Sequence, residues 1–289
     1  AKELRLLQHA LDTSAFGDPG SVCDAFERFG QGVGGTFGWW LKIAGGVKAE
    51  VLTRSARSSP SGGHVLEVGT YCGFSSIRLA SVLPNVRIVT LDLDPVHVMI
   101  ARNMVAYAGL SRSVDVWTGH SKDLLPKLAR RYGDRGEHGV FSALFMDQRG
   151  ARYESDLATL EHLGLLRTGA VVVADNVLKP GAPLFLWHLH VGAYLTVIAR
   201  VPEFAMQAED WMTVSTFWSG SAAPRRSGRG ATSRSGHASS VSIVGAGGVS
   251  AASGRTSGSG DTIDPGHVGH AARALRLQHM EVEPLRTEA

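Results

Sequence analysis

From residue 64 onward, hydrophobic positions along this chain follow two alternating patterns. Short apolar runs bounded by glycine or polar residues are typical of buried strands. We expect such strands at Val65–Val68, Arg87–Asp92, Val114–Thr118, Phe141–Met146 and Ala170–Ala174, with later strands at Leu195–Val201 and Thr213–Trp218. Segments with helical spacing lie between them, at Ile77–Leu83, Val96–Ala108, Lys122–Tyr132, Tyr153–Leu163 and Pro183–His190. This alternation predicts an α/β fold with a doubly wound, mainly parallel sheet of seven strands.

The segment before the first strand is predicted to be mostly helical. Apolar residues recur at helical spacing in Lys2–Leu11, Val22–Phe29 and Val47–Ala56. Between the last two of these, the glycine-rich stretch Gly30–Gly46 is expected to be a loop. It contains Trp39 and Trp40, one of which either covers a pocket or packs the loop itself.

The C-terminal segment has a different composition. From Ser219 to Asp261 the chain is rich in Ser, Gly, Ala and Arg, and we expect it to be disordered. Residues 219–289 carry a formal charge of +3, which equals the charge of the whole 289-residue chain, so residues 1–218 are formally neutral. The basic balance therefore belongs to the tail and does not predict a nucleic-acid partner for the folded domain.

Cysteine content and hydropathy limit the class of protein. Two cysteines, Cys23 and Cys72, are too few for a disulfide framework and favour a reducing compartment. No signal peptide pattern and no apolar run long enough to span a bilayer is found. We expect a cytoplasmic protein, with the reservation that the chain begins at Ala1 and an upstream segment can have been removed.

The first predicted strand leads into a glycine turn. Gly69 and Gly73 allow a sharp turn, and Ser75 or Ser76 is a good N-cap for the helix that follows. The turn lacks the three glycines of a dinucleotide fingerprint and the Gly-Lys-Ser/Thr of a phosphate loop. Together with Asp92 at the end of the next strand, it favours a ligand with a ribose and no phosphate, such as S-adenosylmethionine. The alternative is an ordinary turn with a surface aspartate.

Acidic residues end three of the predicted strands. Asp92, Asp147 and Asp175 stand at these positions, and Asn176 follows the last. Because the carboxyl ends of parallel strands meet at one edge of a sheet, Asp147, Asp175 and Asn176 are expected to lie close together. Two carboxylates and one amide oxygen suit Mg²⁺. The alternative is that the two aspartates only cap the helices that follow them.

Two long motifs resemble those of the catechol O-methyltransferase family. Val65-Leu66-Glu67-Val68-Gly69-Thr70-Tyr71-Cys72-Gly73-Phe74-Ser75 is similar to the family's cofactor motif, and Ala174-Asp175-Asn176-Val177 with Pro180-Gly181-Ala182-Pro183 is similar to its metal motif. The resemblance runs from Lys2 to about Trp218. It implies the Rossmann-like fold of class I methyltransferases over residues 1–218 and a separate tail over residues 219–289.

The resemblance also implies roles for individual residues. S-adenosylmethionine would be bound at its methionine end, its ribose and its adenine by Glu67, Gly69, Tyr71, Gly73, Ser75, Asp92, Ser121, Asp147 and Gln148. Leu41 and Ile43 fall near residues that cover the cofactor. Mg²⁺ would be held by Asp147, Asp175 and Asn176. Glu203 is the match to the acid that binds the second catechol hydroxyl.

The chain departs from the family beside the first metal aspartate. The family's general-base lysine is replaced by Gly150, and its histidine beside the cofactor is replaced by Gln148. Transmembrane-type O-methyltransferases also lack that lysine. Lys179 or Lys42 is our candidate for a substitute base, and the alternative is that both are exposed to solvent.

The expected function is therefore Mg²⁺-dependent O-methylation of a small catechol or phenol. The alternative is a weakened member of the family that binds cofactor and metal and acts as a scaffold. A methyltransferase that acts on protein or RNA is the weakest interpretation, because the folded part is neutral. The sequence does not indicate an oligomeric state.

Overall fold

The structure, a computed structural model, describes residues 2–37, 41–133, 139–219 and 240–244. Trp39 and Trp40 lie outside these residues, as does most of the tail for which disorder is expected. Within the described part of the chain, no helix is both long enough and apolar enough to cross a membrane.

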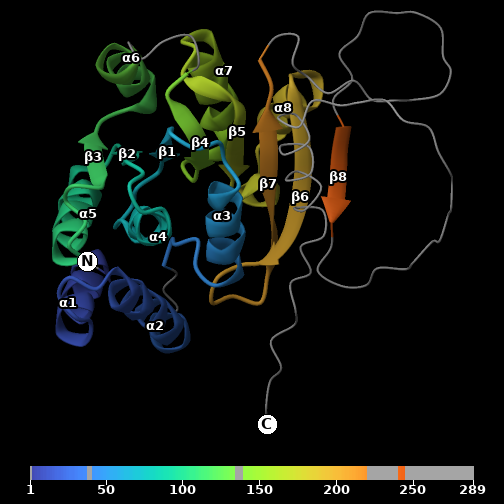
Figure 1. The fold of residues 1–289 in the computed structure, drawn as a ribbon. Coiled ribbons are helices and arrows are strands. Elements are labelled where there is room, and N and C mark those ends of the chain that lie inside the picture. The colour runs from blue at the N-terminus through green and yellow to red at the C-terminus, as the bar shows by residue number, and fades with distance from the viewer. Residues whose placement is uncertain (1, 38–40, 134–138, 220–239, 245–289) are drawn as a thin grey trace, which may run out of the picture.

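The centre of the fold is one sheet in the order β3-β2-β1-β4-β5-β7-β6-β8 (Figure 1). Strands β1 to β5 pair in parallel, and β7 lies antiparallel between β5 and β6. The strands are β1 (His64–Val68), β2 (Ile88–Asp92), β3 (Val114–Thr118), β4 (Phe141–Met146), β5 (Leu166–Ala174), β6 (Tyr194–Pro202), β7 (Glu209–Phe217) and β8 (Ser240–Val244). The predicted seven-stranded, mainly parallel sheet is confirmed by β1 to β7.

Strand β8 is an addition that the sequence did not suggest. Ser240–Val244 pairs in parallel with Leu195–Ala199 of β6, at the edge of the sheet (Figure 1). It comes from the segment expected to be disordered. Its residues Val241 and Ile243 alternate with serines, a period that fits a strand. The open edge of β6 supplies the backbone groups with which such a strand pairs.

Helices cover both faces of the sheet. The first face packs against α1 (Lys2–Thr13), α2 (Pro19–Phe37), α3 (Val47–Arg57), α4 (Phe74–Val82) and α5 (Pro95–Tyr107). The second face packs against α6 (Ser121–Tyr132), α7 (Tyr153–His162) and α8 (Pro183–Val191). Because side chains alternate along a strand, Val65 of β1 enters the first core and Leu66 the second. The doubly wound arrangement is thus confirmed.

Two local predictions are corrected. Helix α2 continues to Phe37, across the glycines that predicted a loop from residue 30. Gly30 serves close packing instead, because a Cβ there would lie 2.6 Å from the ring of Phe204. The N-cap of α4 is Gly73 in the left-handed region, with no side-chain cap. The hydroxyl of Ser76 bonds Glu67 instead of capping the helix.

Candidate functional site

The glycine turn after β1 lies directly against the end of β4. Gly69 has φ +111°, and a Cβ at this position would lie 2.5 Å from the carbonyl oxygen of Asp147. The backbone N–H of Asp147 donates to the carbonyl of Val68 at 2.8 Å. The predicted cofactor turn and the first predicted metal ligand therefore meet at the carboxyl edge of the sheet.

Glu67 is a buried carboxylate next to this turn. Its Oε2 accepts from the hydroxyls of Ser76 and Thr90, whereas its Oε1 has no hydrogen-bond partner among the described residues. Burial raises the pKa of Glu67, and the surrounding hydroxyls oppose that shift. A buried acceptor without a partner is costly unless a ligand supplies the donor. The ammonium group of an amino-acid ligand would fit that need.

Tyr71 links the turn to the end of β2 and to α1. Its backbone N–H donates to Asp92 Oδ2 at 2.7 Å, and its hydroxyl donates to Glu3 Oε1 at 2.9 Å. Asp92 Oδ1 accepts from the backbone N–H of Asp94 at 2.9 Å, and His97 lies within 3.8 Å of it. The predicted ribose-binding acid is therefore fixed by backbone donors at the edge of the sheet.

Gln148 and Ser121 both form hydrogen bonds with another acid, Asp156 of α7. Gln148 Nε2 donates to Asp156 Oδ2 at 3.0 Å, and Gln148 Oε1 is buried with no hydrogen-bond partner in the described part of the chain. Burial raises the pKa of Asp156, and a hydrogen bond from Ser121 opposes that shift. Asp156 thus joins Ser121, predicted at the adenine, to Gln148, predicted beside the cofactor. Sequence reasoning did not single it out.

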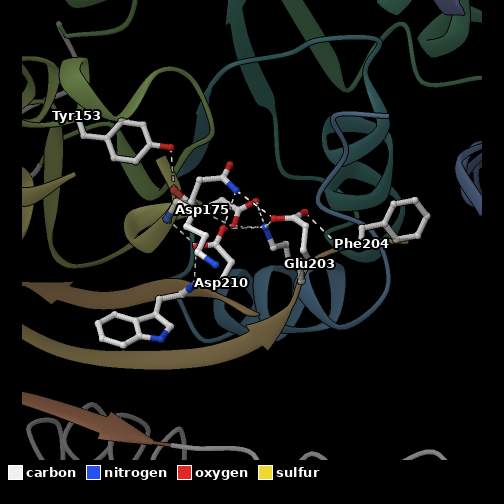
Figure 2. A network of polar contacts seen from close by, with 9 residues as sticks. Tyr153, Asp175, Glu203, Phe204 and Asp210 are labelled. Carbon is white, nitrogen blue, oxygen red and sulfur yellow. Dashed lines mark hydrogen bonds and ion pairs between the residues drawn. The ribbon is translucent and has the colours of Figure 1, made fainter. Parts of the chain in front are cut away.

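Two of the predicted acids, Asp175 and Glu203, lie with Asp210 around one buried lysine. Lys48 Nζ lies 2.9 Å from Asp175 Oδ1, 2.7 Å from Glu203 Oε2 and 3.2 Å from Asp210 Oδ2. The lysine is 0% exposed. Burial lowers its pKa, but the charge of Asp175 and the bond to Glu203 outweigh burial and hold the pKa above its ordinary value. Figure 2 shows Asp175, Glu203 and Asp210 turned toward one another.

Glu203 is held in this cluster by the residue that follows it. The ring of Phe204 lies against Gly30 and Gly45, where a Cβ would meet it at 2.6 Å. Figure 2 shows Phe204 directly beside Glu203, and its backbone N–H donates to Glu203 Oε1 at 3.1 Å. Leu41 and Ile43, the predicted cofactor-covering residues, are buried in the same core.

Asp147 and Asp175 interact through their charges at the edge of the sheet. Burial and the charge of Asp175 raise the pKa of Asp147 well above its ordinary range. Burial also raises the pKa of Asp175, although Lys48 opposes that shift. Among the described residues, no group of three or more His, Cys, Asp or Glu side chains has the arrangement of a metal site. The predicted set instead combines two carboxylates with the amide of Asn176, and hard oxygens of this kind fit Mg²⁺.

The position of the family's lysine is closed to a side chain. A Cβ on Gly150 would lie 2.5 Å from the carbonyl oxygen of Gly181, in the segment η2 (Val177–Gly181). The candidate substitutes Lys179 and Lys42 are both exposed. The charge of Lys179 acts on the exposed Glu209, whose pKa is lowered chiefly by Arg200. The assignment of Lys179 or Lys42 as the general base therefore stays a hypothesis.

Lys48 and Asp210 are the site residues that sequence reasoning missed. Lys48 had a usable signal, because it shares the buried face of α3 with Val51, Leu52 and Ser55. A lysine on such a face requires buried partners. Asp210 had no comparable signal, since it lies near the start of a strand in an alternating segment.

The chain is similar in sequence to known O-methyltransferases. A model of the O-methyltransferase family matches residues 60–185. Catechol O-methyltransferase of Bos taurus is 38% identical over 188 residues, which are 64% of this chain and 65% of that protein. Catechol O-methyltransferase B of Danio rerio is 36% identical over 74% of this chain and 78% of that protein. Transmembrane O-methyltransferase of Homo sapiens is 32% identical over 64% of this chain and 60% of that protein.

Solved structures show the same fold. The O-methyltransferase TomG from Streptomyces achromogenes, in complex with SAM, matches with a TM-score of 0.54 and 22% identity, over 66% of this chain and 89% of that one. At this identity the likeness concerns the fold alone. The chain spans slightly less than two thirds of the length of the Bos taurus relative.

Proposed function

The chain belongs to the family of catechol O-methyltransferase, and from that premise we propose that it methylates one hydroxyl of a small catechol-type molecule. The methyl donor would be S-adenosylmethionine, and the reaction would depend on Mg²⁺. One observation carries the proposal: the close approach of Gly69 to Asp147, which brings the cofactor turn to the predicted metal ligands.

Polar groups at the site support the proposal that it binds both S-adenosylmethionine and Mg²⁺. Glu67 Oε1 and Gln148 Oε1 have no partner among the residues that the structure describes, and they would accept from the ammonium and the adenine amino group of the cofactor. Asp147, Asp175 and Asn176 would hold Mg²⁺. When bound, Mg²⁺ would orient two vicinal oxygens and lower the pKa of the attacking one.

The protein's own part in the transfer would be binding and alignment. S-adenosylmethionine, when bound, would supply the methyl group to the acceptor oxygen and would leave as its thioether, and the hydroxyl proton would pass to solvent water. Glu203 would accept a hydrogen bond from the second hydroxyl, because it stands in the cluster with 11% of its side chain exposed. Holding two bound reactants in line lowers the barrier without a covalent intermediate.

The test is radiolabelled methyl transfer from S-adenosylmethionine to catechol, with Mg²⁺ and with EDTA. We expect turnover that EDTA abolishes and Mg²⁺ restores. Absence of turnover on catechol and on a panel of phenols, in a protein that binds cofactor, would reject the enzymatic proposal. Turnover that EDTA does not affect would reject the Mg²⁺ dependence.

A second candidate is favoured by one observation. Gly150 leaves no space for the family's lysine, so a member that binds cofactor and metal and acts through a partner protein is the alternative. Calorimetry with S-adenosylhomocysteine beside the transfer assay separates the two. Binding without turnover favours the scaffold.

A further inference from the structure

Asn176 can serve as a metal ligand only if its amide oxygen faces the cation. An amide carries an acceptor oxygen and a donor nitrogen, and its partners decide which way each points. Asn176 Nδ2 donates to Asp210 Oδ2 at 2.7 Å and lies 3.4 Å from Glu203 Oε2. An ionised carboxylate can only accept, so the nitrogen must face these acids. The oxygen is thereby left for another partner.

Asp210 has both of its oxygens occupied by protein donors. Oδ2 accepts from Asn176 and from Lys48 Nζ at 3.2 Å. Oδ1 accepts from the backbone N–H of Lys179 at 3.2 Å and of Trp211 at 2.7 Å. The residue is 1% exposed. A buried carboxylate with four donors is an orienting group and has no free position for a substrate or a metal.

The positive charge of Lys48 offsets the repulsion between the carboxylates that surround it. Its ammonium has three donors, and it faces the carboxylates of Asp175, Glu203 and Asp210. Without that charge, the two buried carboxylates of Asp175 and Asp210 and the partly exposed one of Glu203 would face one another unpaired, which is strongly unfavourable. Lys48 therefore supports a charged Asp210 beside the amide of Asn176.

We propose that Asp210 is a positioning residue, which with Lys48 as its counter-charge fixes the amide of Asn176 with the oxygen directed to the cation that the proposed function requires. The inference rests on that function. Partners of this kind behind a metal ligand typically change metal affinity by about 10–100-fold when they are removed.

The experiment measures Mn²⁺ binding to the full chain by electron paramagnetic resonance. In Asp210→Asn the amide of Asn176 loses its short bond to a carboxylate, keeps only the longer 3.4 Å contact with Glu203, and can turn more freely. We expect Mn²⁺ affinity to fall about 10–100-fold. Affinity for S-adenosylhomocysteine in EDTA, measured by calorimetry, should stay within about twofold, since Glu67 and its neighbours are untouched. The control is Glu209→Gln, which removes an exposed neighbouring acid paired with Arg200 and should leave Mn²⁺ affinity unchanged.

If Asp210→Asn fails to fold, a second set of variants still tests the inference. These variants exchange the side chains of Asn176 and Asp210. In Asn176→Asp alone, two carboxylates face each other and Mn²⁺ affinity should fall. In the double variant Asn176→Asp with Asp210→Asn, a donor again faces an acceptor and the total charge is that of the wild type. We expect the double variant to recover at least about tenfold over Asn176→Asp, a coupling typical of groups in contact.

Two results would overturn the inference. One is Mn²⁺ affinity in Asp210→Asn within about twofold of a wild type that binds the metal. The other is a double variant that binds no better than Asn176→Asp. A wild type that neither binds Mn²⁺ nor transfers methyl groups is a different result, because it rejects the proposed function and this inference with it.

Discussion

Gly150 is the single residue with the most direct consequence for activity. Because a Cβ there would lie 2.5 Å from the backbone oxygen of Gly181, the lysine of the relatives cannot be restored without moving the η2 segment. We expect Gly150→Lys to lower the free energy of unfolding by about 1–3 kcal/mol and not to raise turnover. Urea denaturation and the transfer assay measure the two effects.

Gly32→Ala is the matched control for that variant. Gly32 is an exposed glycine of α2 whose Cβ would meet nothing within 4 Å. Its replacement should be neutral or stabilising by up to about 1 kcal/mol, because alanine favours a helix. A Gly150→Lys protein as stable as the wild type and more active would show that the η2 segment moves aside easily.

Lys179 provides a second prediction for a single residue. Its side chain is exposed and its charge acts on Glu209, so we expect Lys179→Ala to keep turnover within about threefold across pH. A loss of about 10²-fold or more with a changed pH–rate profile would instead identify Lys179 as the base. The measurement is kcat from pH 6 to pH 9.

The sequence predicted the location of a single residue correctly where the residue ends a strand of the parallel sheet. Asp147 and Asp175 end neighbouring parallel strands, so the sequence alone places them at one edge. Lys48 and Asp210 are 162 residues apart, and their contact depends on how β7 is inserted in the sheet. No local sequence pattern predicts a contact between residues so far apart in the chain. The loop predicted from residue 30 was wrong because glycines that permit close packing look the same as glycines that permit turns.

Between elements, the junction of β1 and β4 depends on Gly69. An added Cβ would meet the backbone of Asp147 and require φ +111°, so we expect Gly69→Ala to destabilise the fold and abolish S-adenosylhomocysteine binding. Gly164→Ala is the control, since Gly164 has φ +63° and open space around it. The difference in unfolding free energy between the two, expected to be about 2 kcal/mol, measures the collision together with the greater backbone strain at φ +111°. Equal stabilities would contradict the close approach.

The packing of α8 against α7 and β6 predicts a dependence on pH. His188 Nε2 lies 3.0 Å from Glu161 Oε1, and its Nδ1 lies 3.5 Å from Glu154 Oε1. Tyr194 of β6 donates to the same oxygen of Glu161. The hydrogen bond to Glu161 raises the pKa of His188 above 6.5. Since the folded value is the higher one, the stabilisation is complete below pH 6.5 and is lost as pH rises through the folded pKa.

The variant His188→Gln tests that dependence. At about pH 5.5 the wild type should be more stable than the variant by about 1 kcal/mol, a value reduced by partial exposure. Near pH 9 the gap should nearly close. Urea denaturation at both pH values measures it. A gap that is constant with pH, or larger at pH 9, would contradict the assignment of charge to His188.

For whole elements the sequence was most informative where strands and helices alternate. The apolar runs of β1, β2 and β4 are buried on both faces and bounded by turns, so their positions followed from composition. Strand β8 could not be predicted, because five residues in a Ser- and Gly-rich segment form a strand only when the edge of β6 is available.

At the scale of the whole molecule, we propose that residues 1–218 form the methyltransferase domain. A chain ending at residue 218 lacks β8, and one ending at residue 244 retains it. We expect both to bind S-adenosylhomocysteine, and the shorter to melt about 2–4 °C lower because β6 loses its partner strand. Differential scanning calorimetry makes the comparison. Loss of cofactor binding in the shorter chain would show that the domain extends further.

The place of β7 has a consequence for synthesis on the ribosome. β7 is the seventh strand to be made, yet it lies between β5 and β6. Until residue 209 has emerged, β5 remains an open edge, and a row of unpaired backbone groups on a buried, apolar strand invites pairing with another chain. Products that stop before β7 would therefore aggregate, whereas products that stop after residue 218 would not. The same strand brings Asp210, so the nascent chain covers the edge of β5 and completes its polar cluster in one late step.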